Sequence, residues 1–338
     1  MNRKKRIRSL LADRKADRNG FWTGYPTEEA LKIYCKELGI KADQLSLARK
    51  MKSDFLWIPG ELCWAPKDGQ KLFDVHGGKE QKSLSQPGVF ANCETIEEIE
   101  DFDWPNPDGF DFSKLSTHLS GARLFGFATM SGMWSPFFHI VDAFFGMENY
   151  YCKMYTHPEL VEAVTERIID FYLIANKRCF EKLGKKIDCF FMGNDFGSQR
   201  DLLISPKMFE RFVLPYLKKL IDLAKSYDLP VMLHSCGSIA KVIPMLIDAG
   251  IDALHPLQAK AAGMEATSLA QYKNDIVFVG GVDTQELLPF KSAQEVKEEV
   301  YRLKDIFGDG FIVSPSHEGL LPNVPLENVI AMRDAALE

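Results

Sequence analysis

The sequence predicts an α/β fold in which eight parallel strands, each followed by helical structure, close into a (β/α)8 (TIM) barrel. Three observations favour this fold. Eight apolar runs alternate with helical patterns, most runs are continuously apolar rather than alternating, and polar residues recur at their carboxyl ends. Continuous apolar runs are typical of parallel strands that helices cover. The predicted strands span residues 20–23, 54–59, 123–129, 188–195, 230–236, 253–258, 276–283 and 310–317.

The predicted helices are amphipathic segments between these strands. Thr27 is the expected N-cap of the first one, Ser205-Pro206 opens another, and Gly250 ends a third. The segments span residues 27–38, 158–182, 205–227, 239–249, 293–307 and 325–336.

The length and composition indicate one large domain. The chain has 338 residues, 46% of them hydrophobic, and α/β barrels often exceed about 250 residues as a single domain. We expect residues 1–338 to form one barrel with an N-terminal helical extension over about 1–18 and a flap-like insertion over about 61–113.

The insertion interrupts the strand–helix alternation. Residues 67–86 are interpreted as a polar hairpin or flap, with Asp68-Gly69 and Gly77-Gly78 as turn signals, and residues 104–113 as a loop. Both segments follow the second strand, so they are expected near the end of the barrel that holds the active site, where they could form a lid or a pocket edge. The alternative is a surface excursion without a role.

Charge and cysteine content exclude several classes of protein. The net charge of −6 argues against a nucleic-acid surface, and no apolar run is long enough to span a membrane. The basic segment 3–8 is short and is interpreted as a solvated helix start. It is not a signal peptide, because no apolar stretch follows it. Seven cysteines, an odd number, indicate free thiols in a reducing cytoplasm, with Cys189 in the core.

His234 and Cys236 end the fifth predicted strand. Residues i and i+2 of a strand face the same side, so both side chains can reach one metal ion. Zinc accepts imidazole nitrogen and thiolate sulfur, and a catalytic zinc needs three protein ligands. We predict His317, at the end of the eighth strand, as the third ligand. The alternative for each histidine is an ordinary hydrogen bond in the core.

Other polar and aromatic residues also lie at predicted strand ends, where a barrel keeps its active site. Asp195 and Glu61 are predicted catalytic groups, although Asp195 could instead cap a loop. The predicted substrate-binding residues are Gln258, Asp283, Tyr25, Trp22 and His255. Three of these have open alternatives: a tight turn for Asp283, and plain core for the two aromatic residues. Gln258, His255 or Glu318 could also contact the metal or orient a ligand.

Five sequence blocks together resemble the uroporphyrinogen decarboxylase superfamily, and the resemblance covers nearly the whole chain. The blocks are residues 144–150 with 155–160, residues 203–206 with 212–216, His234-Ser235-Cys236-Gly237, Gly280-Gly281-Val282-Asp283, and residues 322–329.

The superfamily includes the decarboxylase and zinc-dependent methyltransferases linked to corrinoids. The methyltransferase branch holds zinc with His-x-Cys at the fifth strand and a Cys near the end of the eighth. His234 and Cys236 match the first two positions, whereas Ser316-His317 stands at the third. The resemblance implies a zinc-dependent enzyme that moves a methyl group between a small substrate and a corrinoid protein. It also implies a homodimer.

Decarboxylation is the alternative activity. The decarboxylase grips its substrate with paired arginines in an N-terminal motif, and the matching residues 21–26 contain none. Its acidic residue after the second strand falls near Glu61 in a rough overlay. A metal-free decarboxylase acting on another carboxylated substrate therefore stays open, as does a non-enzymatic module that binds a corrinoid or tetrapyrrole.

Overall fold

Eight parallel strands form the centre of the computed structural model, which describes residues 1–338 except 68, 79, 81 and 84–85. The strands pair in the order β1-β8-β7-β6-β5-β4-β3-β2. Their bounds are β1 Gly20–Phe21, β2 Phe55–Trp57, β3 Ala128–Ser131, β4 Cys189–Gly193, β5 Val231–His234, β6 Ala253–His255, β7 Val277–Val282 and β8 Phe311–Pro315. The predicted barrel is confirmed, and each predicted strand overlaps an observed one.

The barrel is nearly closed, because β1 and β2 are the two ends of the sheet order. Asp54 joins them. Its backbone N–H donates to the Phe21 carbonyl over 2.8 Å, and its Oδ2 accepts from the Phe21 N–H over 2.9 Å. The backbone and the buried side chain of Asp54 thus each supply one of the hydrogen bonds that a strand ladder supplies elsewhere in the barrel.

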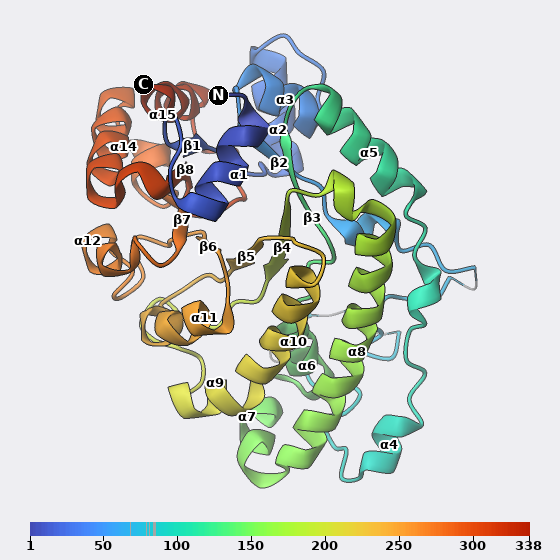
Figure 1. Ribbon diagram of the computed structural model, residues 1–338. Helices are drawn as coiled ribbons and strands as arrows, with labels where there is room; N and C mark the ends of the chain where they lie inside the picture. The colour runs from blue at the N-terminus through green and yellow to red at the C-terminus, as the bar shows by residue number, and fades with distance from the viewer. Residues whose placement is uncertain (68, 79, 81, 84–85) are drawn as a thin grey trace.

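Helices surround the sheet, and the long α8 and α10 lie side by side along one flank (Figure 1). The α-helices are α1 Arg3–Asp13, α2 Glu28–Glu37, α3 Gln44–Lys50, α4 Ile96–Glu100, α5 Ser113–Leu124, α6 Phe137–Phe145, α7 Met147–Thr156, α8 Pro158–Leu183, α9 Pro206–Phe212, α10 Leu214–Lys225, α11 Ile243–Ala249, α12 Ala266–Leu269, α13 Leu287–Phe290, α14 Ala293–Phe307 and α15 Leu326–Leu337.

Capping residues set several helix starts as predicted. The Thr27 side chain accepts from the Ala30 N–H at the start of α2, and α14 has the predicted bounds with a capping box. The predicted helix 205–227 is wrong in one respect, since it divides into α9 and α10 after Phe212. Pro215 lacks an N–H and its ring would clash with the carbonyl four residues earlier.

Two predicted strand boundaries are also corrected. Arg123 and Leu124 end α5 rather than beginning the third strand, and β3 starts only after Gly126, which turns the chain at φ +78°. The sixth strand ends at His255, because Pro256 has no N–H to donate to a ladder.

The helix α1 closes the amino-terminal end of the barrel (Figure 1). Its Ile7, Leu10 and Leu11 side chains pack against the residues that fill the barrel interior. Those interior residues include Trp22, Phe55, Ala128, Met130, Cys189, Phe191, Met232, Ala253, Val277, Val279 and Ile312. The predicted core position of Cys189 is therefore confirmed, and chemistry is left to the opposite, carboxyl end of the strands.

The basic segment in α1 differs from the expected solvated helix start. Arg6 is only 6% exposed and pairs with Asp17 and Asp54, each over 2.7 Å. Arg8 reaches Asp188, which lies just before β4, over 2.6 Å. These ion pairs fasten α1 to the strands that it covers.

The insertion is not the predicted hairpin. The described residues of 67–86 contain no strand, and Asp68 of the predicted Asp68-Gly69 turn lies outside the described residues. Phe73 packs between Phe144, Phe171 and Tyr172, so this part of the insertion is anchored to α6 and α8. The predicted loop 104–113 contains a 3-10 turn, Pro107–Gly109.

The described part of the chain contains no helix that is both long and apolar enough to cross a bilayer. All seven cysteines are free thiols, as predicted.

Candidate active site

His234 and Cys236 meet at the carboxyl end of β5. The His234 Nε2 lies 3.3 Å from the Cys236 Sγ, so the two side chains share one face, as the spacing predicts. His234 is 3% exposed, whereas Cys236 is partly exposed. The chain can turn away directly after Cys236 because Gly237 adopts φ +83° and any side chain there would collide with the Gly197 backbone.

Asp195, from the loop after β4, joins this pair. Its Oδ1 accepts from the Cys236 N–H over 2.8 Å and lies 3.3 Å from the His234 Nε2. The ligand atoms of Asp195, His234 and Cys236 all lie within 4.8 Å of one another. A carboxylate oxygen, an imidazole nitrogen and a thiol sulfur are a donor set that suits zinc.

The other nitrogen of His234 faces a second polar group. His234 Nδ1 lies 3.0 Å from the His255 Nδ1 and 3.3 Å from the Glu318 Oε2. His255 Nε2 and Glu318 Oε2 are buried and have no hydrogen-bond partner among the described residues. His234 therefore lies between two clusters, with Cys236 and Asp195 on one side and His255 and Glu318 on the other.

His317, the predicted third ligand, lies beside Cys236. It hydrogen-bonds to the Cys236 thiol, and its ring centroid is 6.2 Å from that of His234. Its Nδ1 accepts from the Gly319 N–H over 3.0 Å. The neutral His317 ring therefore carries its proton on Nε2 and can donate a hydrogen bond from there. Among the described residues, His317 belongs to neither group of clustered metal-ligand atoms.

Neighbouring charges shift the pKa values of His234 and Cys236 in opposite directions. Burial lowers the pKa of His234, but Glu318, Asp195 and Cys236 outweigh burial and hold it well above its ordinary value. Burial raises the pKa of the Cys236 thiol, but hydrogen bonds to His234 and His317 outweigh burial, so the net pKa is lowered. The cluster therefore favours a thiolate, the form of cysteine that binds metals and acts as a nucleophile.

Asp195 and His255 are shifted by the same neighbours. Burial raises the pKa of Asp195, but the hydrogen bond and charge of His234 outweigh it and hold that pKa well below the ordinary range. Burial lowers the pKa of His255, and the charges of His234 and His317 lower it further. Asp195 is thus ionised and His255 neutral near pH 7.

Trp134, which the sequence reasoning missed, covers the His234 ring. Its ring centroid lies 5.1 Å from that of His234 and 5.0 Å from those of Trp57 and Phe191. Gly193 makes this position accessible, because a Cβ there would lie 1.9 Å from an indole carbon. That glycine at a strand end is the signal in the sequence that a bulky group approaches.

Three side chains hold the loop that carries Trp134. The Glu61 carboxylate accepts from the Trp134 N–H, the Asn176 Oδ1 accepts from the Met133 N–H over 2.8 Å, and the Asn194 Nδ2 donates to the Ser135 carbonyl over 3.0 Å. Ser135 itself has φ +54°, a strained value for a residue other than glycine. The loop therefore keeps one conformation against the His234 ring.

Glu61, a predicted catalytic residue, contacts this loop from behind Trp134. Its Oε2 atom is buried without a hydrogen-bond partner among the described residues. Burial raises the pKa of Glu61 to about 7, because ionising it would leave a charge poorly solvated. Glu61 thus contributes to the site through its hydrogen bond to the Trp134 backbone, which lies beside His234.

The two predicted aromatic residues take different places. Tyr25 packs on Trp57 with ring centroids 5.1 Å apart, next to the Trp134 side of the site. Trp22 is 1% exposed and lies in the barrel interior, 5.1 Å from the His255 ring centroid. Trp22 therefore supports the imidazole pair from beneath and does not face an open pocket.

Gln258 and His139 flank the Cys236–Asp195 side. Gln258 Oε1 accepts from the Gly237 N–H over 2.6 Å, which fixes the turn that follows Cys236. His139, on α6, was not predicted. Its Nε2 accepts from the Asp195 N–H over 2.9 Å, and its side chain is 44% exposed. A lone histidine in an apolar helix gives no sequence signal of this contact.

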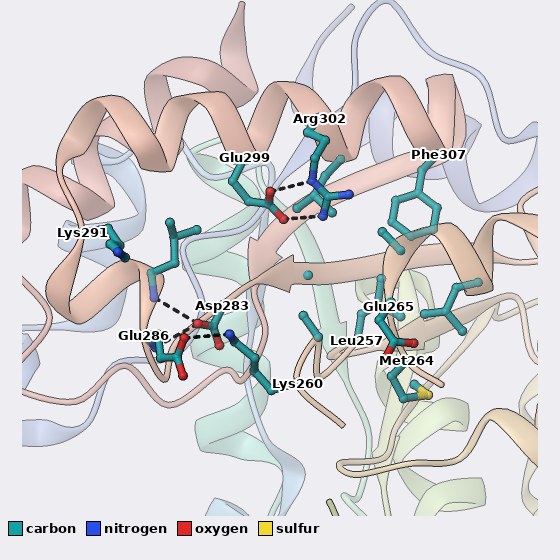
Figure 2. A pocket seen from close by; sticks show the side chains of 16 residues that line it. Leu257, Lys260, Met264, Glu265, Asp283, Glu286, Lys291, Glu299, Arg302 and Phe307 are labelled. Atoms are coloured by element: carbon teal, nitrogen blue, oxygen red, sulfur yellow. Dashed lines mark hydrogen bonds and ion pairs between the residues drawn. The ribbon is translucent and has the colours of Figure 1, made fainter. Parts of the chain in front are cut away.

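Asp283 lies apart from the cluster, beside a cavity of about 340 Å³ that Figure 2 shows. Its Oδ2 accepts from the Glu286 N–H over 2.8 Å, so it caps the turn before α13. Two ion pairs lie beside this cavity, Lys260 with Glu286 and Arg302 with Glu299, each over 2.7 Å (Figure 2). Neither His234 nor Cys236 lines this cavity.

Comparison with known proteins adds a family match. The sequence model of the family described as "Uroporphyrinogen decarboxylase (URO-D)" matches residues 88–338. A methylcobamide:CoM methyltransferase of Methanosarcina mazei is 23% identical over 261 residues, which cover 74% of this chain and 71% of that protein. A uroporphyrinogen decarboxylase of Geotalea daltonii is 28% identical over 185 residues, and the match spans 49% of its length.

A solved structure has the same fold. The structure titled "methyltransferase from Methanosarcina mazei" superimposes with a TM-score of 0.71 and covers 99% of this chain and 98% of its own. The two sequences are 16% identical, so the likeness extends to the fold alone.

Proposed function

The chain belongs to the uroporphyrinogen decarboxylase family, and on this premise we propose that it is a zinc-dependent methyltransferase. The proposed reaction moves a methyl group between a small substrate and a corrinoid protein. The methylcobamide:CoM methyltransferases among its relatives support this choice, one of them over 74% of the chain.

The main support is the convergence of three kinds of donor atom at the mouth of the barrel. We propose that His234 Nε2, Cys236 Sγ and Asp195 hold the zinc, since their ligand atoms are mutually close. His317 then donates a hydrogen bond to the Cys236 sulfur, because its Nδ1 is already an acceptor. Zinc bound there would supply Lewis acidity, which lowers the pKa of a nucleophile or polarises a leaving group.

The surrounding residues have supporting roles in this proposal. A proton on His234 Nδ1 can be held by Glu318, whose buried Oε2 otherwise has no hydrogen-bond partner. His139 accepts a hydrogen bond from the Asp195 N–H and would hold the loop that carries this proposed ligand. Trp134 and Trp57 form an apolar wall that excludes water from the His234 side.

Two alternatives differ in what they require. A decarboxylase acting on a substrate with several carboxylates needs cations in its pocket. Among the described residues, no arginine hydrogen-bonds or ion-pairs with His234, Cys236, Asp195 or Glu318. A module that only binds a corrinoid or tetrapyrrole would not need a thiol of lowered pKa beside two imidazoles.

Metal analysis of the purified protein tests the proposal. We expect about one zinc per chain in the wild type and its loss in Cys236→Ser and His234→Ala. Cys152→Ser and His118→Ala are matched controls, because both residues are exposed and neither belongs to a group of clustered ligand atoms. Methyl transfer from a methylcobamide, followed by its visible absorption, should stop in the first two variants only. Full zinc and full turnover in Cys236→Ser would reject the proposal.

A further inference from the structure

A second cleft lies at the opposite end of the barrel from His234. It has a volume of about 590 Å³ and is lined by α1, by Lys52 before β2, and by the turn at Phe125-Gly126 before β3. Four cationic side chains line it: Arg3, Arg6, Arg18 and Lys52. This concentration of positive charge contrasts with the net charge of −6 for the whole chain.

Two of these cations are already neutralised. Arg6 forms ion pairs with Asp17 and Asp54, and Arg18 pairs with Asp54 over 2.9 Å. These pairs fasten α1 to the barrel, and the hydrogen bonds of both carboxylates are taken up largely by Arg6 and Arg18.

Arg3, which lines the cleft, and Arg49 beside it meet at Phe125, and among the described residues neither forms an ion pair. Arg3 Nη1 donates to the Phe125 carbonyl over 3.3 Å, and the Arg49 guanidinium lies 3.9 Å from the centre of the Phe125 ring. Lys52 lines the same cleft, and among the described residues its side chain forms no ion pair or hydrogen bond. Three like charges held together repel one another unless an anion lies between them.

The electrostatics of Arg3 reflect this crowding. Its pKa is lowered by burial and by the nearby charges of Arg18, Arg49 and Arg6, against the opposing charge of Asp54. Arg3 is also the first residue of α1, whose unpaired backbone N–H groups and dipole favour an anion at this end. The guanidinium cluster and the helix end therefore favour the same kind of ligand.

We propose that this cleft binds a compact multivalent anion, the phosphate group of a small soluble metabolite. Arg3 offers a planar guanidinium that can hold two phosphate oxygens, and Lys52 and Arg49 add positive charge at the rim. The site is separate from the proposed methyltransferase site, because it lies at the amino-terminal end of the strands. The proposal is therefore independent of the proposed reaction.

Inorganic pyrophosphate is the probe for the test, titrated calorimetrically against the full-length protein at constant ionic strength set with potassium chloride. We expect saturable binding to the wild type and at least about tenfold weaker binding to Lys52→Glu. Lys207→Glu on α9 is the matched control, since it makes the same charge change at an exposed lysine outside the cleft. Arg3→Lys keeps the charge but loses the planar fork, and should bind with intermediate affinity.

Three results would overturn the proposal. The first is the absence of saturable pyrophosphate binding to wild-type protein. The second is equal weakening by Lys52→Glu and Lys207→Glu, which would indicate unspecific attraction. The third is binding to vesicles that contain anionic phospholipid without binding to pyrophosphate, which would assign the cleft to a lipid headgroup. Circular dichroism of each variant verifies that the fold is intact.

Discussion

At the scale of single residues, His234 is the connecting group of the site. Its Nε2 faces Cys236 and Asp195, and its Nδ1 faces His255 and Glu318. A metal on one ring nitrogen leaves the other to donate its proton to a carboxylate or another acceptor, which fixes the ring and raises its basicity. In His234 one ring nitrogen would bind the proposed metal and the other would donate its proton. Substitutions beside either nitrogen should therefore change metal binding.

The third ligand of the proposed zinc can be identified by comparing two variants. Asp195→Ala should weaken zinc binding by about 100-fold or more, because it removes a charged ligand. His317→Ala should change zinc affinity less, since the lone pair on its Nδ1 is already used by Gly319. Competition with a coloured chelator measures both affinities. Loss of zinc in His317→Ala with retention in Asp195→Ala would instead identify His317 as the ligand.

Glu61 should make stability depend on pH. Its pKa is raised by burial from 4.5 to about 7, so the native state holds a proton that the unfolded state releases earlier. This contribution is complete below about pH 4.5 and is lost as the pH rises through about 7. Glu61→Gln should remove this loss and be more stable than wild type at pH 8 by about 1–3 kcal/mol.

Urea unfolding at pH 5 and pH 8 measures this effect. Glu210→Gln serves as the control, because Glu210 is an exposed carboxylate on α9. If Glu61→Gln and Glu210→Gln had the same pH dependence, the carboxyl of Glu61 would not be the group that titrates.

At the scale of elements, the end of β4 packs tightly against the loop between β3 and α6, where Gly193 lies under the Trp134 ring. Gly193→Ala would place a Cβ 1.9 Å from a Trp134 ring carbon, so the indole must move away from His234. We expect a loss of about 1–3 kcal/mol in stability and a red shift of tryptophan emission.

Gly184→Ala is the matched control for that variant. Gly184 has helical dihedral angles and its nearest neighbour would be 3.9 Å from a new Cβ, so alanine should be neutral or slightly stabilising. An unchanged emission spectrum in Gly193→Ala would mean that Trp134 is not held against the strand end.

The β1–β2 seam is a second feature at this scale. Asp54 bridges the seam and pairs with Arg6 and Arg18, so Asp54→Ala would leave buried donors without partners. The expected cost is about 3–5 kcal/mol in the free energy of unfolding, measured with denaturant. Asp17→Ala should cost less, because the Asp17 side chain is 35% exposed and water can replace it. Equal costs would show that the seam does not depend on Asp54.

At the scale of the whole molecule, the two ends of the barrel carry different chemical groups. Its amino-terminal end is closed by α1 and carries a concentration of positive charge, whereas the carboxyl ends of the strands carry the thiol, imidazole and carboxylate cluster. The apolar interior between them gives the cluster a rigid base, which sites at the ends of parallel strands need.

Removal of the proposed zinc should therefore leave the fold intact. The core is built without the cluster, unlike that of a zinc finger, so chelator treatment should not change the far-UV circular dichroism. The midpoint of thermal unfolding should fall by about 2–5 °C, because a ligand that binds only the native state stabilises it. Unfolding on chelation would mean that the metal is structural.

The sequence alone determined the features that depend on local order along the chain. Continuous apolar runs predicted all eight strands. Helix bounds followed from Thr27 as an N-cap and from the end residues of the segment 293–307. The two-residue spacing predicted that His234 and Cys236 share a face. Periodicity, caps and i, i+2 geometry act within a few residues, so they can be inferred without knowing the fold in three dimensions.

Only the tertiary structure decided which groups from different strands meet. In the folded chain, Asp195 contacts Cys236 and Trp134 packs on the His234 ring. Glu61 hydrogen-bonds to the Trp134 backbone, and Arg6 is a buried ion-pair partner of Asp54. These contacts join residues far apart in the chain, and they depend on barrel closure and on which way each loop turns. No local pattern encodes that geometry, because packing of the whole core selects it.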